Sequence, residues 1–119
     1  EEGQITINGD GETSRDFTYV DNAVQANDLA LFSSNEKALN QIYNVACGDQ
    51  MSLNDMVGML QEISGQELQP HYGPERPGDV KHSQADIHKI ESLLGYKPEV
   101  RFEEGLEKVY EWYKQDEKA

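Results

Sequence analysis

The sequence is short of positive charge, of cysteine and of long apolar stretches. Its 119 residues include 10 Lys and Arg against 23 Asp and Glu, which gives a formal net charge of −13. A surface this acidic repels phosphate backbones and anionic lipids, which argues against nucleic acid or an anionic membrane as partner. The single cysteine, Cys47, cannot form an internal disulfide, and no apolar run approaches the length that crosses a bilayer. We therefore expect a cytoplasmic protein that binds neither nucleic acid nor membrane.

Residues that bind metals or dinucleotides are also scarce. His71 and His82 are not joined by a second cluster of Cys, His or carboxylates at ligand spacing, so we expect no metal site. Cys47 lies in an apolar stretch without a clear activating base and is interpreted as a small buried hydrophobe. The turn Gly-x-x-Gly-x-x-Gly, which binds the pyrophosphate of NAD, does not occur.

Two segments have the residue pattern of β-strands. Residues 4–9, QITING, alternate β-branched and polar side chains and run into a Gly-Asp-Gly turn. Residues 41–48, QIYNVACG, are rich in β-branched and aromatic side chains, which predicts a buried strand. Residues 68–72, LQPHY, predict only a short extended piece.

Four segments predict helices. Asp21 is a suitable N-cap for a helix that carries alanines at helical spacing. Ser52, with Asp55 three residues later, predicts the start of a second helix, which Gly65 ends. Asp86 predicts the start of a third helix. A fourth has an apolar face that comprises Phe102, Leu106, Val109, Tyr110 and Tyr113.

These elements predict an α/β fold, of the α+β kind, in which helices predominate. At 119 residues the chain has the size of one small domain, over residues 1–119. The sequence begins at a strand pattern without an initiator Met, so we expect a piece of a longer protein.

A local cluster of cations interrupts the acidic sequence. The stretch GPERPGDVKHSQADI, residues 73–87, contains Arg76 and Lys81 together with Gly-Pro and Pro-Gly pairs, which predict turns. Arg15 follows the glycine turn of residues 9–11. Two arginines in loops suit a diphosphate, because the planar guanidinium forms paired hydrogen bonds with phosphate oxygens. Asp79 is a candidate acceptor for a sugar hydroxyl. The alternative is structural: Arg15 pairs with Asp16 in a turn, and Asp79 only closes the Pro-Gly turn.

Four motifs, in this order and spacing, resemble a known family. They are INGDGETSRDFTYVDN, YNVACGDQMSLNDM, RPGDVKHSQADIHKIESLLGYKP and GLEKVYEWY. Together they resemble the C-terminal part of extended short-chain dehydrogenases/reductases, and within that family bacterial UDP-N-acetylglucosamine 4-epimerases. The resemblance implies a substrate-binding C-terminal domain whose Rossmann half lies outside the chain. NAD and the catalytic Tyr and Lys would belong to that half, so no residue of this chain would be catalytic or bind a cofactor.

The resemblance also implies roles for residues of the cationic loops. Arg15, in the RDF motif, and Arg76, in the RPGD motif, match the two arginines that bind the diphosphate in the family. Asp79 matches the carboxylate that accepts hydrogen bonds from the uridine ribose.

Three further positions match contacts to the uracil, the nucleoside and the sugar. Leu53 falls at an apolar contact to the nucleoside, and Asn8 lies where backbone groups meet the uracil, although many relatives have an aromatic residue at that position. Ser83 lies where strict UDP-galactose epimerases carry a Tyr. A small residue at this position leaves room for a 2-acetamido group, which predicts N-acetylhexosamine substrates.

The resemblance therefore implies the UDP-sugar-binding lobe of an isomerase of nucleotide-sugar metabolism and polysaccharide biosynthesis. The full-length protein would interconvert UDP-N-acetylglucosamine and UDP-N-acetylgalactosamine with NAD, as a homodimer, and this chain alone would be inactive. Two alternatives stay open. One is another nucleotide-sugar epimerase, dehydratase or decarboxylase, for example one acting on UDP-uronate, and the other is a noncatalytic protein-interaction domain.

Overall fold

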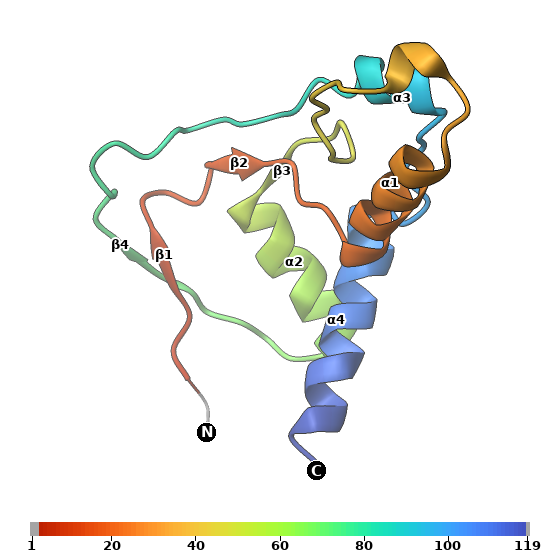
Figure 1. The fold of residues 1–119 in the computed structure, drawn as a ribbon. Coiled ribbons are helices and arrows are strands. Elements are labelled where there is room, and N and C mark those ends of the chain that lie inside the picture. The colour runs from red at the N-terminus through yellow and green to blue at the C-terminus, as the bar shows by residue number, and fades with distance from the viewer. Residues whose placement is uncertain (1–2, 119) are drawn as a thin grey trace. The chain divides into compact units, whose positions relative to one another are not determined.

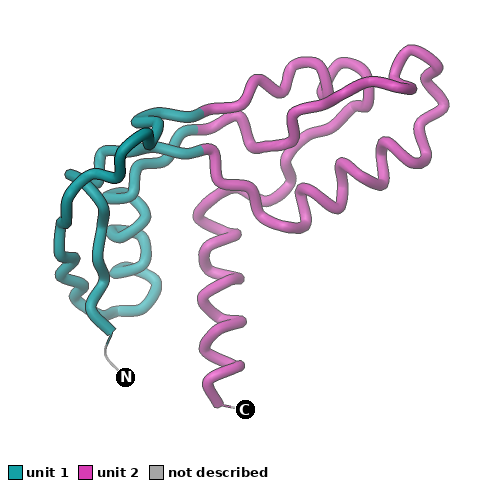
Figure 2. The backbone as a smooth tube through the Cα atoms, turned by 60° about the vertical axis from the view of Figure 1, so that its left-hand side comes forward, with its two compact units in different colours: residues 1–15, 50–83 teal, residues 16–49, 84–119 magenta. Residues whose placement is uncertain are grey.

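The structure, a computed structural model, describes residues 3–118 and divides into two compact units (Figures 1 and 2). Unit 1 comprises Glu1–Arg15 and Gln50–Ser83, and unit 2 comprises Asp16–Asp49 and Gln84–Ala119. The predicted mixed α/β class is confirmed, because in the described residues helices predominate over two small sheets. No helix in this part of the chain is long and apolar enough to cross a membrane.

Unit 1 contains two short sheets and one helix. Its elements are β1 (Thr6–Asn8), β2 (Ser14–Arg15), β3 (Met51–Ser52), α2 (Leu53–Ser64) and β4 (His71–Gly73). Strands β1 and β4 pair in parallel and lie side by side in Figure 1, with Ile7 opposite Tyr72. Strands β2 and β3 pair antiparallel, with Arg15 opposite Met51. The strand predicted over residues 4–9 is thus confirmed at its centre, and β4 overlaps the last two residues of the predicted extended piece and continues to Gly73.

Helix α2 forms as its sequence predicts. The Ser52 hydroxyl accepts a hydrogen bond from the Asp55 backbone N–H at 3.0 Å, and the Asp55 carboxylate accepts one from the Ser52 N–H at 3.4 Å. This reciprocal capping satisfies donors that a helix start leaves without partners. Gly65 ends the helix in the left-handed conformation, at φ +68°.

Unit 2 is helical and holds the main hydrophobic core. Its elements are α1 (Val20–Phe32), the 3₁₀-helix η1 (Glu36–Ala38), α3 (His88–Leu94) and α4 (Phe102–Asp116). The core consists of Ala26, Ala38, Ala46, Ile87, Ile90, Leu94 and Tyr96. Tyr96 is fully buried, and its hydroxyl donates to the Ala46 carbonyl at 2.8 Å. Burial raises the pKa of the Tyr96 hydroxyl to about 12, so it remains a donor at neutral pH.

Two predicted helix starts in unit 2 are wrong by one or two residues. The N-cap of α1 is Tyr19, and Asp21 lies inside the first turn. There its carboxylate faces the positive end of the helix dipole, a favourable position that does not require a capping hydrogen bond. The N-cap of α3 is Ile87, but the Asp86 carboxylate still accepts from the His88 backbone N–H at 2.9 Å.

The strand predicted over residues 41–48 is also wrong. This segment has no regular secondary structure and bends at Ala46 and Gly48, and it pairs with no strand in the part of the chain that the structure describes. Side chains hold it instead, since Lys89 donates to the Ile42 carbonyl at 3.0 Å. Ala46 and Cys47 are buried, whereas the Ile42 side chain is 88% exposed. A β-strand needs a partner for its backbone groups, and the residue pattern alone does not supply one.

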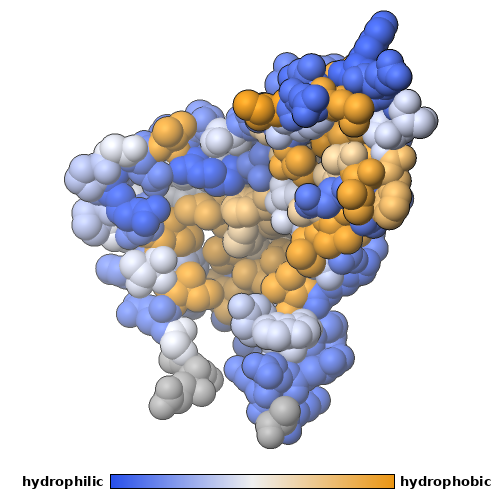
Figure 3. All heavy atoms as spheres, in the orientation of Figure 1, coloured by the Kyte–Doolittle hydropathy of each residue, from blue (hydrophilic) through white to orange (hydrophobic). Residues whose placement is uncertain are grey.

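Apolar side chains reach the surface of unit 2. Figure 3 shows hydrophobic residues on the face turned to the viewer. The most exposed large ones in α1 and the segment that follows it are Val20, Val24, Leu31, Phe32, Leu39 and Ile42.

Candidate functional site

Arg15, Arg76 and Asp79 meet in unit 1, although Arg15 and Asp79 are 64 positions apart in the sequence. Arg15 Nη2 donates to Asp79 Oδ1 at 2.8 Å. Arg76 Nη2 lies 3.8 Å from the other carboxylate oxygen, Asp79 Oδ2. The Asp79 carboxylate therefore bridges two guanidinium groups.

The loop after β4 reaches β2 through backbone hydrogen bonds. The Ser14 N–H donates to the Lys81 carbonyl at 2.8 Å, and the Ser83 N–H donates to the Ser14 carbonyl at 3.1 Å. Ser14 Oγ and His82 Nδ1 also lie 2.8 Å apart. Because Arg15 directly follows Ser14, this pairing brings its guanidinium to the carboxylate of Asp79. The turn that carries Asp79 contains Gly78 at φ +79°, a conformation that glycine adopts without strain.

Of the two local alternatives for these charges, the turn at Asp79 forms, but a longer-range contact replaces the pair of Arg15 with Asp16. Asp16 does not pair with Arg15, since its carboxylate accepts from the backbone N–H groups of Cys47, Gly48 and Ala85. The turn is closed by the backbone of Asp79, whose N–H donates to the Arg76 carbonyl at 3.3 Å. The carboxylate of Asp79 thus remains available to the arginines.

A small cleft opens beside this cluster. It has a volume of about 70 Å³ and is lined by Asn8, Thr13, Glu75, Arg76, Asp79 and Lys81. Of the residues predicted to bind the nucleotide, Asn8, Arg76 and Asp79 line the cleft, and Arg15 joins them through Asp79. Ligand pockets usually measure about 300–1,000 Å³, so the cleft has room for only part of a nucleotide.

Two other predicted residues of the site lie outside this cleft. Leu53 begins α2, half-buried, and its N–H donates to the Thr13 carbonyl at 3.1 Å. Ser83 is exposed beside Ser14. The sequence analysis did not select Thr13 or Glu75, and the only available signal was their place in the same glycine- and proline-rich stretches.

Asn54, which the sequence analysis also did not select, fixes the loop that leads to Arg15. Its N–H donates to the Gly11 carbonyl at 3.0 Å, and its side-chain amide donates to the Asp10 carbonyl at 3.1 Å and to Glu12 Oε1 at 2.7 Å. Tyr72 in turn donates its hydroxyl proton to Asn54 Oδ1 at 2.8 Å. Residues 9–13 are thereby tied to the start of α2 and to β4.

The catalytic Tyr and Lys are expected outside the chain, but one Tyr-x-x-x-Lys spacing does occur here, on α4 at Tyr110 and Lys114. The Lys114 ammonium lies over the Tyr110 ring, 6.0 Å from its centroid, and 3.9 Å from Glu111 Oε1. A lysine that activates a catalytic tyrosine has to approach the phenol oxygen. Lys114 lies over the ring instead, which is typical of an i,i+4 contact between two side chains on the surface of one helix.

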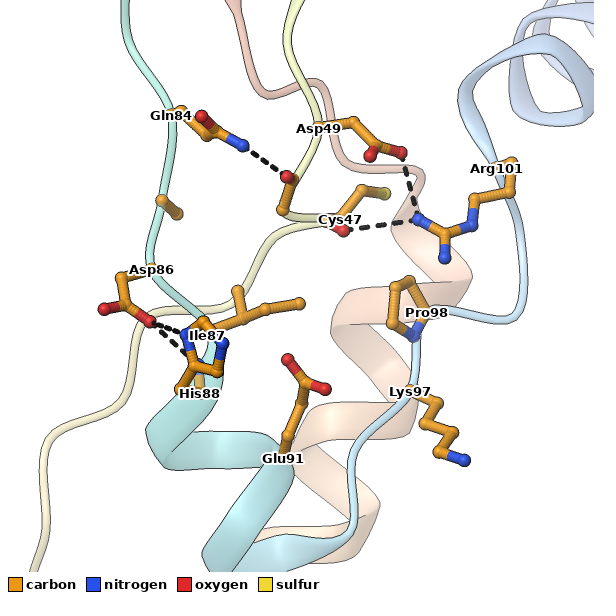
Figure 4. Close-up of a pocket in the computed structure, with 12 residues that line it drawn as sticks. Cys47, Asp49, Gln84, Asp86, Ile87, His88, Glu91, Lys97, Pro98 and Arg101 are labelled. Atoms are coloured by element: carbon orange, nitrogen blue, oxygen red, sulfur yellow. Dashed lines mark hydrogen bonds and ion pairs between the residues drawn. The ribbon is translucent and has the colours of Figure 1, made fainter.

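A larger cavity, of about 710 Å³, lies in unit 2 (Figure 4). Its charges are largely paired: Arg101 Nη1 donates to Asp49 Oδ2 at 2.9 Å, and His88 Nδ1 lies 2.7 Å from Asp86 Oδ1. The hydrogen bond to Asp86 raises the pKa of His88, and hydrogen bonds from the backbone and ring of His88 lower the pKa of Asp86.

Cys47 also lines this cavity but is buried. Burial raises the pKa of the Cys47 thiol, which leaves it protonated and unreactive at neutral pH. None of the residues predicted to bind the nucleotide lines this cavity.

Comparison with known proteins assigns the family. The model of the GDP-mannose 4,6 dehydratase family matches residues 1–109. A putative UDP-glucose 4-epimerase of Methanocaldococcus jannaschii is 36% identical over 113 residues, which are 95% of this chain and 35% of that protein. A UDP-glucuronate 4-epimerase of Thermodesulfobacterium geofontis is 35% identical over 118 residues, 98% of this chain and 35% of that protein.

Solved structures agree with these relatives. The UDP-glucuronic acid 4-epimerase of Bacillus cereus, in complex with UDP-glucuronic acid and NAD, superposes with a TM-score of 0.87 at 36% identity, over 94% of this chain and 35% of that one. The UDP-N-acetylglucosamine 4-epimerase of Methanobrevibacter ruminantium, in complex with UDP-N-acetylmuramic acid, gives a TM-score of 0.85 at 37% identity, over 95% and 35%.

The chain thus spans about a third of the length of the proteins that it matches. Those relatives are UDP-sugar 4-epimerases whose named sugars differ, which supports the predicted class of protein but not one sugar. The chain belongs to the GDP-mannose 4,6 dehydratase family and corresponds to the C-terminal region of NAD-dependent UDP-sugar 4-epimerases and dehydratases.

Proposed function

We propose that residues 1–119 are the substrate-binding C-terminal domain of an NAD-dependent 4-epimerase that interconverts UDP-N-acetylglucosamine and UDP-N-acetylgalactosamine. In this proposal the catalytic Tyr and Lys and the NAD site lie in an N-terminal Rossmann domain outside the chain. NAD, when bound there, supplies the hydride acceptor for C4 of the sugar. The present chain holds the nucleotide, and the full-length protein is a homodimer.

The observation that carries the proposal is the meeting of Arg15, Arg76 and Asp79 from two distant segments. Arg15 and Arg76 would donate to the diphosphate, since guanidinium and phosphate form charge-assisted hydrogen bonds. Asp79 would accept from a ribose hydroxyl. Asn8 lines the same cleft at the end of β1, where the uracil would lie, and Leu53 would contact the nucleoside.

The choice of an N-acetylated sugar depends on Ser83. Its short side chain would leave space for an acetamido group, and a Tyr at this position would fill that space. A second candidate substrate is a UDP-uronate, because a similar solved structure holds UDP-glucuronic acid. A uronate carries a hydroxyl and not an acetamido group at C2, so it does not need the space that the short side chain of Ser83 would leave. We therefore favour the neutral N-acetylated sugar.

The test uses the full-length protein that contains this chain, with UDP-N-acetylglucosamine, UDP-glucose and UDP-glucuronate as separate substrates and product analysis by NMR. We expect 4-epimerisation of UDP-N-acetylglucosamine. Ser83→Tyr should lower kcat/KM for that substrate by about tenfold or more, which corresponds to about 1.4 kcal/mol, while activity on UDP-glucose is kept. An equal loss on both substrates, or no loss on either, would remove Ser83 from the sugar pocket. The isolated chain should show no turnover with NAD added, and turnover by it would contradict the domain assignment.

A further inference from the structure

We propose that Asp79 determines selectivity: it occupies both arginines in the unliganded protein, and so disfavours anions that bring no ribose. The proposal rests on the proposed function and assigns Asp79 a role beyond that of ribose acceptor. The anions that it would exclude are inorganic pyrophosphate and related polyphosphates.

The geometry of the carboxylate carries this inference. Each oxygen of Asp79 faces a different arginine, with Oδ1 2.8 Å from Arg15 Nη2 and Oδ2 3.8 Å from Arg76 Nη2. The remaining terminal nitrogen of Arg15, Nη1, already donates to the Ser14 carbonyl at 2.7 Å. Both terminal nitrogens of Arg15 therefore have acceptors inside the protein before any ligand binds.

Partial burial strengthens the ion pair between Arg15 and Asp79. The side chains of Arg15 and Asp79 are 30% and 32% exposed, so solvent screens the pair less than it screens a fully exposed one. Arg76, at 69% exposure, is held more loosely. Asp79 is thus bound mainly to Arg15, and an incoming phosphate meets an arginine whose charge Asp79 already partly neutralises.

This partial neutralisation has opposite consequences for two kinds of ligand. A nucleoside diphosphate brings a ribose hydroxyl, which can donate a hydrogen bond to Asp79. This bond replaces those that Asp79 loses when the arginines turn to the phosphate. Pyrophosphate brings the same phosphate charge and no such hydroxyl, so Asp79 loses its partners and repels the ligand. Asp79 therefore separates the two ligands by what happens to its own hydrogen bonds.

Asp10 provides a matched control in the same unit. Its carboxylate lies 3.7 Å from Lys81 Nζ and so is also paired with a cation of the cleft, but with a lysine and not with an arginine. Asp10→Asn and Asp79→Asn remove the same charge from the same region. Only Asp79→Asn frees the arginines.

The experiment measures the affinity of the full-length protein for inorganic pyrophosphate, uridine and UDP, by titration calorimetry at fixed ionic strength. Wild type, Asp79→Asn, Asp10→Asn and the double variant Arg15→Ala with Asp79→Asn are compared, and their circular dichroism and thermal unfolding verify folding. We expect Asp79→Asn to bind pyrophosphate roughly fivefold or more tightly than wild type and uridine more weakly. The gain for pyrophosphate should be absent in Asp10→Asn and lost in the double variant.

Three results would overturn the proposal. The first is that folded Asp79→Asn binds pyrophosphate no more tightly than wild type. The second is that Asp10→Asn gains as much pyrophosphate affinity as Asp79→Asn, and the third is that the gain persists when Arg15 is also replaced by Ala. A different result, the absence of UDP binding by wild type, would contradict the proposed function. The comparison of wild type with Asp79→Asn on pyrophosphate can still be made in that case.

Discussion

Arg15 and Arg76 differ in how firmly the fold holds them. Arg15 makes two hydrogen bonds of 2.7 and 2.8 Å and is half-buried, whereas Arg76 is mostly exposed and makes one ion pair of 3.8 Å. An arginine that is already ordered loses less conformational entropy when a ligand binds. The two guanidinium groups therefore need not contribute equally to the binding of a diphosphate.

We expect Ala substitution of either arginine in the full-length protein to weaken UDP binding by about tenfold to a hundredfold, or about 1.5–3 kcal/mol. The loss should be larger for Arg15→Ala, because its side chain is the more ordered one. Calorimetric titration of UDP measures both affinities, and circular dichroism verifies folding. Unchanged affinity in a folded Arg76→Ala protein would argue against a phosphate site formed by the two arginines.

Asn22 is fully buried, and its side chain bonds to the backbone of a distant segment. Its Oδ1 accepts from the N–H groups of Glu99 and Val100 at 3.1 and 3.0 Å, and its Nδ2 donates to the Val100 carbonyl at 2.7 Å. It fixes the segment between α3 and α4 to α1.

We expect Asn22→Ala to lower the free energy of unfolding by about 3 kcal/mol, because the buried N–H and carbonyl of Val100 lose the Asn22 amide, at about 1–3 kcal/mol each. Asn27→Ala is the control, since the Asn27 side chain is exposed and makes a single bond, to the Ala23 carbonyl of its own helix. Urea unfolding monitored by circular dichroism compares the two. Equal, small losses would show that the segment after α3 is held by packing alone.

At the scale of elements, the loop of residues 9–13 is held against the start of α2 at close range. Gly11 has φ +78°, and a Cβ at this position would overlap the Asn54 side-chain amide. The loop thus depends on glycine for two reasons, backbone conformation and space. Gly65, at φ +68°, has the same conformation but no atom near its would-be Cβ.

We expect Gly65→Ala to cost about 1 kcal/mol of stability, the strain of a left-handed residue alone, and Gly11→Ala to cost about 1–3 kcal/mol more. Gly11→Ala should also weaken UDP binding in the full-length protein, because the displaced loop leads directly to Arg15. In the Gly11→Ala, Asn54→Ala double variant the two losses should be less than additive, since the overlap is gone. Full additivity, measured by urea unfolding, would show that the loop yields without cost.

Local signals allowed some elements to be predicted and left others beyond reach. Ser52, Asp55 and Gly65 define α2 because capping depends on residues within one helical turn. The segment 41–48 has the composition of a strand, but its pairing depends on a partner that the composition does not reveal. Arg15 and Asp79 were predicted to share a site through family resemblance. Their direct ion pair had no local signal, because it depends on the backbone pairing of Ser14 with residues 81–83.

At the scale of the whole molecule, a net charge of −13 acts together with the exposed apolar side chains of unit 2. Like charge keeps copies of the chain apart at low ionic strength. At about 0.1 M salt the screening length falls to about 10 Å, and at 1 M to about 3 Å, so this protection weakens as salt is added. Short-range apolar contacts are not screened in this way.

The segment of residues 41–48 therefore affects how the chain behaves in solution. The Ile42 side chain in this segment is 88% exposed, so it offers an apolar contact to another copy. We expect the isolated chain to remain monomeric at low salt and to self-associate reversibly as salt rises, in sedimentation experiments at fixed concentration. Ile42→Lys should shift that onset to higher salt, whereas Gln41→Lys, with the same charge change at a polar neighbour, should shift it less. An onset that moves equally in both variants would mean that net charge alone sets the colloidal stability of this chain, and that the exposed Ile42 side chain makes no contact between copies.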